Sequence, residues 1–254
     1  MLNYHQLLNQ LEDLNLNYIR EFLPDSLDTI VQQELSFVDD LLTLTTAELS
    51  NRKKKKDELR LHRARLPFKK RINNFDFRFQ PQINKSEILD LCSLRFMDTA
   101  DSILFIGNSG VGKSHLAISI ALEAIQKEYS CHFVLSNELI SKLERAHKRG
   151  TLESMLKKYS TYDLLIIDEI DYLPFNKDGT NLFFQLINHR YEKKSMIITT
   201  NNPLSQWAEI FQNKRLTNAI IDRLNHHSKI IQINGPSYRM KDYKENKAKI
   251  STNK

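Results

Sequence analysis

The chain has 254 residues, of which 41% are hydrophobic and 27% are charged, so it can bury a large core and is not expected to be disordered. Its only cysteines, Cys92 and Cys131, exclude a disulfide framework and fit a reducing cytoplasm. The sequence shows no secretory signal, and no apolar run approaches the roughly 20 residues that a membrane helix needs. We therefore expect a cytoplasmic protein without a membrane partner, built from one large and one small domain.

The net charge of +6 is distributed unevenly along the chain. Residues 1–50 carry nine acidic side chains and one basic side chain, whereas residues 52–71 carry eleven basic side chains and two acidic ones. A basic block of this density favours a polyanionic partner, most simply double-stranded DNA. The alternatives are a solvated helix face and an anionic membrane surface, and the lack of a bulky apolar face disfavours the membrane. The side chains expected to contact DNA are Lys53, Lys54, Lys55, Lys56, Arg60, Arg63 and Arg65.

Three helices are expected at the N-terminal end. Apolar residues at helical spacing predict a first helix that ends at Pro24 and a second helix after this proline. A third helix is predicted from about Leu41, through the basic block, to Leu66, where Pro67 would stop it. We therefore expect residues 1–70 to form an all-helical domain that binds DNA or a protein partner.

The composition divides the rest of the chain into three parts. Residues 71–84 contain three phenylalanines and little periodicity, so a linker is expected there. Across residues 85–241, short apolar runs alternate with helical patterns, which is typical of an α/β fold with a parallel sheet between helices. The polar and basic residues 242–254 are expected to be disordered. The five predicted strands are Ser102–Ile106, Cys131–Leu135, Leu164–Asp168, Met196–Thr200 and Lys229–Ile233.

Residues 107–114 read Gly-Asn-Ser-Gly-Val-Gly-Lys-Ser and match the phosphate-binding pattern G-x-x-x-x-G-K-[ST]. An apolar run precedes the pattern and a helical pattern follows it, so backbone N–H groups and a helix N-terminus would surround a polyphosphate. Lys113 would contact the β- and γ-phosphates of ATP, and the Ser114 hydroxyl would bind Mg²⁺. A chance glycine turn is the alternative. The residues expected to bind the nucleotide are Gly107, Asn108, Ser109, Gly110, Val111, Gly112, Lys113 and Ser114.

A second pattern places two carboxylates, Asp168 and Glu169, at the end of a predicted strand. Ligands of open α/β sheets bind at this end of the strands, so Asp168 would hold Mg²⁺ and Glu169 would orient the attacking water. Asp168 lies 55 residues after Lys113, with the run Cys131–Leu135 between them. This spacing predicts an extra strand between the phosphate loop and the acidic strand, as in hydrolytic motor-type NTPases, and disfavours a small-molecule phosphotransferase.

Two later positions are candidate sensors of the nucleotide. Asn201 follows the fourth predicted strand, where it or Thr200 could reach the γ-phosphate; a turn before Pro203 is the alternative. Arg223 lies on a predicted helix before the last strand and would serve a neighbouring subunit as an arginine finger, or else form a surface salt bridge with Asp222 or another carboxylate.

Two histidines follow Arg223 in the sequence. His226 and His227 have no partner cluster in the sequence and are expected to be ordinary surface or interface histidines.

Together these motifs resemble the AAA+ ATPases, and within them the DnaC-like helicase-loader branch and IstB-type helper ATPases of insertion sequences. The basic helical segment followed by Phe75-Asp-Phe77 also looks IstB-like. The resemblance covers roughly residues 40 to 241. The stretches that carry it are Gly107–Leu116, Leu165–Leu173, Thr200-Asn-Asn with Trp207, Asp222-Arg-Leu, and Gly235-Pro-Ser-Tyr-Arg239.

The resemblance implies an ATPase that forms ATP-bound oligomers on DNA and recruits or stimulates a transposase. By position it implies that Lys113, Glu169, Asn201 and Arg223 take part in hydrolysis, and that Arg239 occupies the place of a second phosphate-sensing arginine in some relatives. Three alternatives remain open at this point: a replicative helicase loader with the same fold, a DNA scaffold in which ATP is structural, and the disfavoured phosphotransferase.

Overall fold

A computed structural model describes residues 2–33, 36–170 and 175–240. The chain divides into two compact units, residues 1–59 and residues 60–254. The division falls within a helix, earlier in the chain than the expected boundary at residues 71–84. The segment expected as a tail, residues 242–254, lies outside the described residues. No helix in the described part of the chain is long and apolar enough to span a membrane.

The first unit consists of helices α1 (Leu2–Asp13) and α2 (Asn17–Gln33) and most of α3 (Phe37–Ala64). The predicted break at Pro24 is wrong, because the proline lies inside α2. The chain turns instead at Asn15, whose φ of 56° is left-handed and ends α1. A proline inside a helix destabilises the helix by about 3 kcal/mol. The burial of Ile19 and Leu23 in the small core of this unit offsets that cost.

The third helix starts four residues earlier than predicted and ends two residues earlier. Its last residue is Ala64, and Arg65 follows in the left-handed region, with a φ of 53°. Pro67 disfavours the helical conformation at the residue before it, which explains why the helix ends here. In the first unit, Glu48 of α3 is buried and accepts hydrogen bonds from the backbone N–H groups of Tyr18 and Ile19 at the start of α2.

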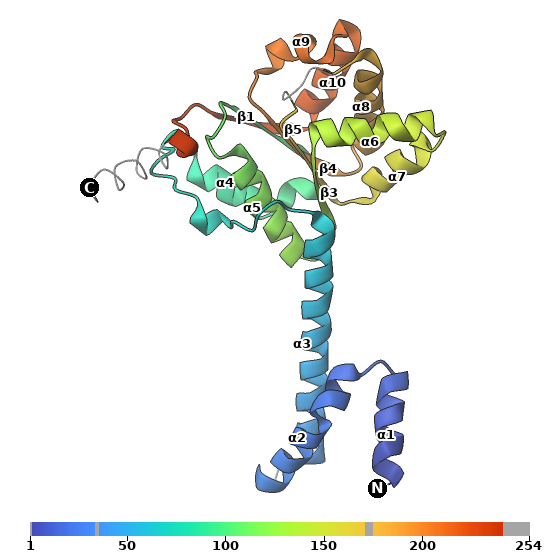
Figure 1. Cartoon of the computed structure of the whole chain (residues 1–254). Helices are drawn as coiled ribbons and strands as arrows, with labels where there is room; N and C mark the ends of the chain where they lie inside the picture. The colour runs from blue at the N-terminus through green and yellow to red at the C-terminus, as the bar shows by residue number, and fades with distance from the viewer. Residues whose placement is uncertain (1, 34–35, 171–174, 241–254) are drawn as a thin grey trace, which may run out of the picture. The chain divides into compact units, whose positions relative to one another are not determined.

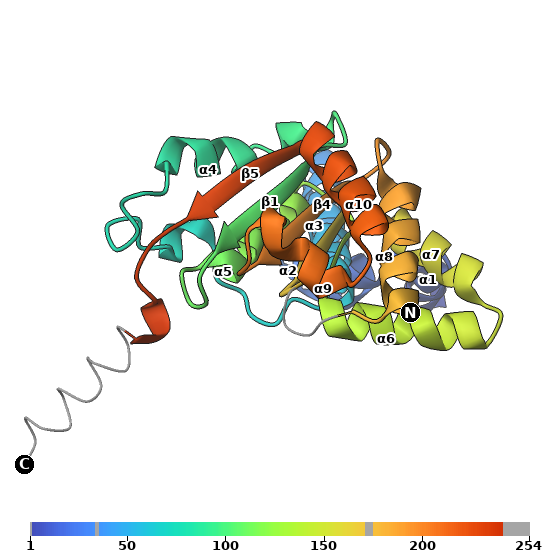
Figure 2. The same ribbon diagram turned by 90° about the horizontal axis from the view of Figure 1, so that it is seen from above.

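The second unit is built on a five-stranded parallel sheet with the order β2-β3-β4-β1-β5. Figure 2 shows β5, β1 and β4 side by side in this sheet. All five predicted strands are confirmed, with one residue added at either end of some. The sheet has an extra strand between the phosphate-loop strand and the acidic strand, as predicted, but this strand is β4. The expected strand, β2, instead lies at the edge beyond β3. The strands are β1 (Ser102–Gly107), β2 (Cys131–Leu135), β3 (Leu164–Asp168), β4 (Ser195–Thr200) and β5 (Ser228–Ile233).

Helices cover both faces of this sheet (Figure 1). Alternate residues of each strand point to opposite faces, so Ile103 and Phe105 join one core and Leu104 and Ile106 the other. The first core includes α4 (Lys85–Cys92) and α5 (Lys113–Gln126). The second includes α6 (Ser136–Lys148), α7 (Leu152–Thr161), α8 (Lys177–Arg190), α9 (Trp207–Phe211) and α10 (Lys214–His226). Among the described residues, short 3₁₀ helices occupy Ile72–Asn74, Arg95–Met97 and Leu204–Gln206.

The expected linker is part of the second unit. Ile72, Phe75 and Ile83 are buried in the same core as α5, and the carbonyl of Lys70 accepts a hydrogen bond from Ser119 of α5. Two isoleucines and one phenylalanine thus bury the segment, and Phe77 packs against the same core. This segment therefore packs beside the phosphate loop and is not a free linker between domains.

Candidate nucleotide-binding site

The phosphate loop joins β1 to α5, as the sequence predicted. Gly110 and Gly112 have positive φ angles of 80° and 103°. A Cβ atom at Gly110 would lie 2.2 Å from Ser237 Oγ, and one at Gly112 would lie 2.6 Å from Phe75 Cε2. Both positions therefore need glycine, for the backbone angle and for the close approach of the neighbouring segments.

The Lys113 side chain is buried at the start of α5, with 6% of its surface exposed. Its Nζ donates hydrogen bonds to the carbonyls of Gly107 at 2.7 Å and Asn108 at 2.9 Å, and to Asn201 Oδ1 at 2.8 Å. A buried ammonium needs such oxygen partners, and it would exchange them for phosphate oxygens without leaving its place. The contact with Asn201 brings the predicted sensor to the phosphate loop.

The Ser114 hydroxyl faces the acidic strand. It donates to Asp168, with distances of 2.8 Å to Oδ1 and 3.0 Å to Oδ2. A hydroxyl beside a carboxylate supplies the hard oxygen ligands that Mg²⁺ prefers, so these two residues fit the metal that the sequence assigned to them. Glu169, the next residue, lines the cavity beside them.

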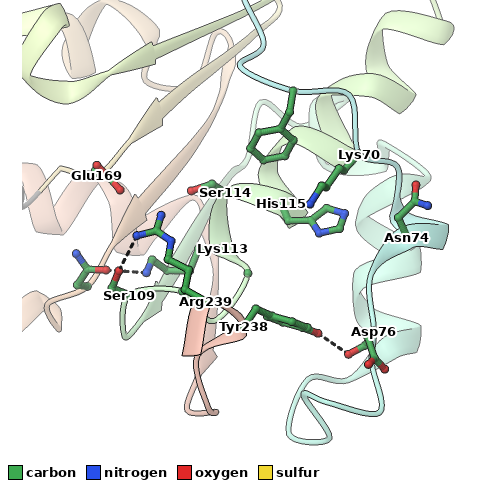
Figure 3. Close-up of a pocket in the computed structure, with 14 residues that line it drawn as sticks. Lys70, Asn74, Asp76, Ser109, Lys113, Ser114, His115, Glu169, Tyr238 and Arg239 are labelled. Carbon is green, nitrogen blue, oxygen red and sulfur yellow. Dashed lines mark hydrogen bonds between the residues drawn. The ribbon is translucent and has the colours of Figure 1, made fainter. Parts of the chain in front are cut away.

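The remaining wall of the cavity comes from two segments far apart in the sequence (Figure 3). The Tyr238 hydroxyl donates to the Asp76 carbonyl at 2.5 Å, and its backbone N–H donates to the Gly110 carbonyl at 2.8 Å. Arg239 reaches Ser109 Oγ at 3.4 Å. The cavity has a volume of about 360 Å³, within the usual range for small-molecule sites. Its wall residues that the sequence analysis missed are Phe68, Lys70, Asn74, Asp76, His115 and Tyr238.

Arg223 does not line this cavity, in contrast to the other predicted catalytic residues. Its guanidinium lies over the rings of Phe184, 4.9 Å from the centroid, and Tyr191, 5.9 Å away, and it donates to the Ala219 carbonyl at 2.9 Å. Within the described residues it forms no ion pair with Asp222 or with another carboxylate, in contrast to the surface salt bridge considered from the sequence. Stacking on aromatic rings does not use the N–H groups of the guanidinium, so those not bonded to Ala219 can donate to another acceptor.

The histidines after Arg223 also lie outside the cavity. His227 contacts Glu192 at 3.1 Å and Asp101 at 3.3 Å, and His226 contacts the Tyr191 hydroxyl at 3.0 Å. Glu192, His226 and His227 place one potential ligand atom each within 4.8 Å of one another, a grouping that the sequence did not reveal. These contacts link the end of α10 to the turn after α8.

The basic side chains predicted to bind DNA have different surroundings. Those of residues 53–56 on α3 are exposed, as are Arg63 and Arg65. Arg60 is half-buried and pairs with Glu128 at 3.6 Å, so part of its charge is already neutralised. Most of this basic set is therefore exposed to solvent.

Comparisons with known proteins identify the family. The model of the family described as IstB-like ATP binding protein matches residues 9–246. The chain belongs to this family. It is 46% identical over 246 residues to the ATP-binding protein of insertion sequence IS232 from Bacillus thuringiensis subsp. berliner, covering 96% of this chain and 98% of the relative. It is 37% identical over 238 residues to the ATP-binding protein of insertion sequence IS21 from Pseudomonas aeruginosa, covering 94% and 90%.

A solved structure supports the fold of this IstB-like chain. AMPPCP-bound DnaA from Aquifex aeolicus has a TM-score of 0.56 and 19% identity, over 66% of this chain and 51% of DnaA. The chain thus spans about half the length of that structure and shares its AAA+ P-loop fold. The resemblance seen in the motifs is confirmed: this is an IstB-like ATP-binding protein with an AAA+ fold.

His115 in the cavity wall predicts a pH dependence of stability. Burial and the charge of Lys70 lower the pKa of His115, although the hydrogen bond to the Arg71 carbonyl opposes this shift. Because the unfolded chain then takes up this proton at a higher pH, the contribution of His115 is present above about pH 6.5 and is lost as the pH falls through the lowered value. We expect H115Q to lose less stability than the wild type between pH 7.5 and pH 5, measured by urea unfolding without nucleotide.

The H147Q variant, at an exposed position on α6, controls for the loss of a histidine as such. Equal losses of stability for wild type and H115Q over this pH range would contradict the assignment of His115.

Proposed function

We propose that this protein is an ATP-dependent DNA-binding helper of transposition. It binds and hydrolyses ATP, assembles into oligomers on double-stranded DNA in the ATP-bound state, and recruits or stimulates a transposase. The observation that supports this proposal is the convergence of three strand ends on one cavity. Lys113 follows β1, Glu169 follows β3 and Asn201 follows β4, and all three line the cavity. Asp168, the last residue of β3, contacts Ser114 in the cavity wall.

Each of the residues that the sequence predicted at this site has a distinct role in this proposal. Lys113 exchanges its carbonyl partners for β- and γ-phosphate oxygens, and Asn201 contacts the γ-phosphate or the attacking water. Ser114 and Asp168 would hold Mg²⁺, and a bound Mg²⁺ would supply positive charge against the phosphate oxygens. Glu169 polarises the water that attacks the γ-phosphate, which yields ADP and inorganic phosphate.

Arg223 completes the site of a neighbouring subunit. Its position on α10, outside the cavity of its own chain, agrees with a role in trans, and its guanidinium has donors left for a phosphate oxygen. ATP would then stabilise the contact between subunits, and hydrolysis would weaken it. The bound nucleotide would thus control whether the subunits assemble, and the protein partner would respond to the assembled form.

The helical region of residues 1–70 binds DNA in this proposal, and residues 85–241 form the ATPase domain. The exposed lysines of α3 neutralise backbone phosphates, so binding depends steeply on salt and little on sequence. The two relatives named above come from insertion sequences, which favours a transposase over a replicative helicase as the partner. Capture of a purified transposase, but not of a helicase, would test this choice.

The first test removes the proposed activator of water. E169Q keeps the size of Glu169 but lacks the carboxylate, so we expect retained ATP binding, hydrolysis slowed at least about tenfold, and longer-lived DNA complexes. Turnover is measured by phosphate release and DNA residence by dissociation kinetics. E153Q, at an exposed glutamate on α7, serves as the matched control. Normal turnover in E169Q would remove Glu169 from this role.

The second test asks whether Arg223 acts between subunits. R223A should bind ATP as a monomer but lose cooperative assembly and turnover, while K113A should lose ATP binding. In a mixture, K113A supplies Arg223 to the intact site of R223A, so partial hydrolysis should return. The absence of rescue at every mixing ratio would argue against a finger in trans.

A further inference from the structure

Glu169 has a backbone conformation that its residue type disfavours. Its φ of 57° lies in the left-handed region, where a side chain crowds the following carbonyl. A non-glycine residue stays there only when its surroundings hold it. The position directly after β3 therefore needs specific support.

Two hydroxyl groups supply that support, one from the start of α6 directly after β2 and one from β4. Ser136 directly follows β2 and donates its Oγ to the Glu169 carbonyl at 2.6 Å. Thr199 on β4 accepts the Glu169 N–H at its Oγ1, 2.9 Å away. The strand register explains the geometry, since Leu135 pairs with Asp168 and Ile167 pairs with Ile198. Both backbone polar groups of Glu169 are thus fixed by side chains.

Thr199 also contacts the other carboxylate of the acidic pair. Its hydroxyl donates to Asp168 Oδ1 at 2.5 Å, so one oxygen accepts from the backbone of Glu169 and donates to the side chain of Asp168. Thr199 is fully buried and Asp168 is 5% exposed, so water does not compete for these hydrogen bonds. Two residues further along, Asn201 accepts from Lys113, so the same strand contacts the phosphate lysine and the acidic pair.

We propose that Thr199 is a positioning residue for hydrolysis, with Ser136 as its counterpart on the other side of β3. The two hydroxyls hold the main chain of Glu169 so that its carboxylate points into the nucleotide cavity, and Thr199 fixes the orientation of Asp168. Neither residue lines the cavity or needs to touch ATP. This inference rests on the proposed ATPase activity. It adds an explanation of how the Glu169 carboxylate is held in the orientation that hydrolysis needs.

The test compares T199V with T199S. Valine keeps the volume of threonine but removes the donor to Asp168 and the acceptor for the Glu169 N–H. Serine restores both. We expect T199V to lower kcat at least about tenfold while the Kd for ATP changes less than about threefold, and T199S to recover most of the loss, because removing a positioning contact affects the transition state more than binding. S136A should lower kcat in the same sense.

T180V is the matched control. Thr180 is also fully buried, and its hydroxyl donates to the Phe211 carbonyl away from the cavity, so its loss reports the general effect of deleting a buried threonine hydroxyl. Nucleotide binding is measured with a fluorescent ATP analogue and turnover by phosphate release.

Three results would overturn the inference: kcat of T199V within twofold of the wild type, an equal loss of ATP affinity and kcat, or no recovery in T199S. If T199V does not fold, S136A decides, and normal turnover in S136A refutes the inference. A wild-type protein without hydrolysis would refute the proposed function instead, so the two failures are distinguishable.

Discussion

The buried ammonium of Lys113 is the interaction on which the site depends. It joins the carbonyls of the phosphate loop to Asn201 on the neighbouring segment, and it does so because β1 and β4 are adjacent, with Ile106 paired to Thr200. A charge with so little exposure requires a complete set of oxygen partners. These partners hold the Lys113 ammonium in place before a polyphosphate binds. Less conformational entropy is therefore lost when the polyphosphate binds.

The order of the strands brings the acidic residues close to Lys113 and Asn201. Because β4 lies between β1 and β3, the strand that Asn201 directly follows also runs beside the strand that ends at Asp168. Ser114 reaches Asp168 from α5, and Thr199 reaches it from β4. Ser114, Asp168, Thr199 and the Glu169 backbone thus share one hydrogen-bonded network, and the Lys113–Asn201 contact lies beside it at the ends of adjacent strands.

The sequence predicted the chemical groups better than the walls that surround them. The phosphate loop and the strands have local patterns, glycine spacing and apolar runs, so both could be read directly. The cavity wall depends on contacts such as that of Tyr238 with Asp76, which no local pattern encodes. The aromatic residues around Phe75 have no periodicity that predicts packing, because their partners lie far away in the sequence, on α5 and at Tyr238. Pro24 misled the prediction because tertiary packing outweighed its local preference, and the role of Thr199 depends on strand register.

The central claim is that a nucleotide held by this network controls assembly. The most direct measurement is the mass of the protein in solution by light scattering, with ATP, ADP or no nucleotide, each with and without double-stranded DNA and at two salt concentrations. The account predicts assemblies larger than one chain with ATP, promoted by DNA at low salt, and their loss with ADP. A single chain under every condition, or a mass that does not change with the nucleotide, would contradict it.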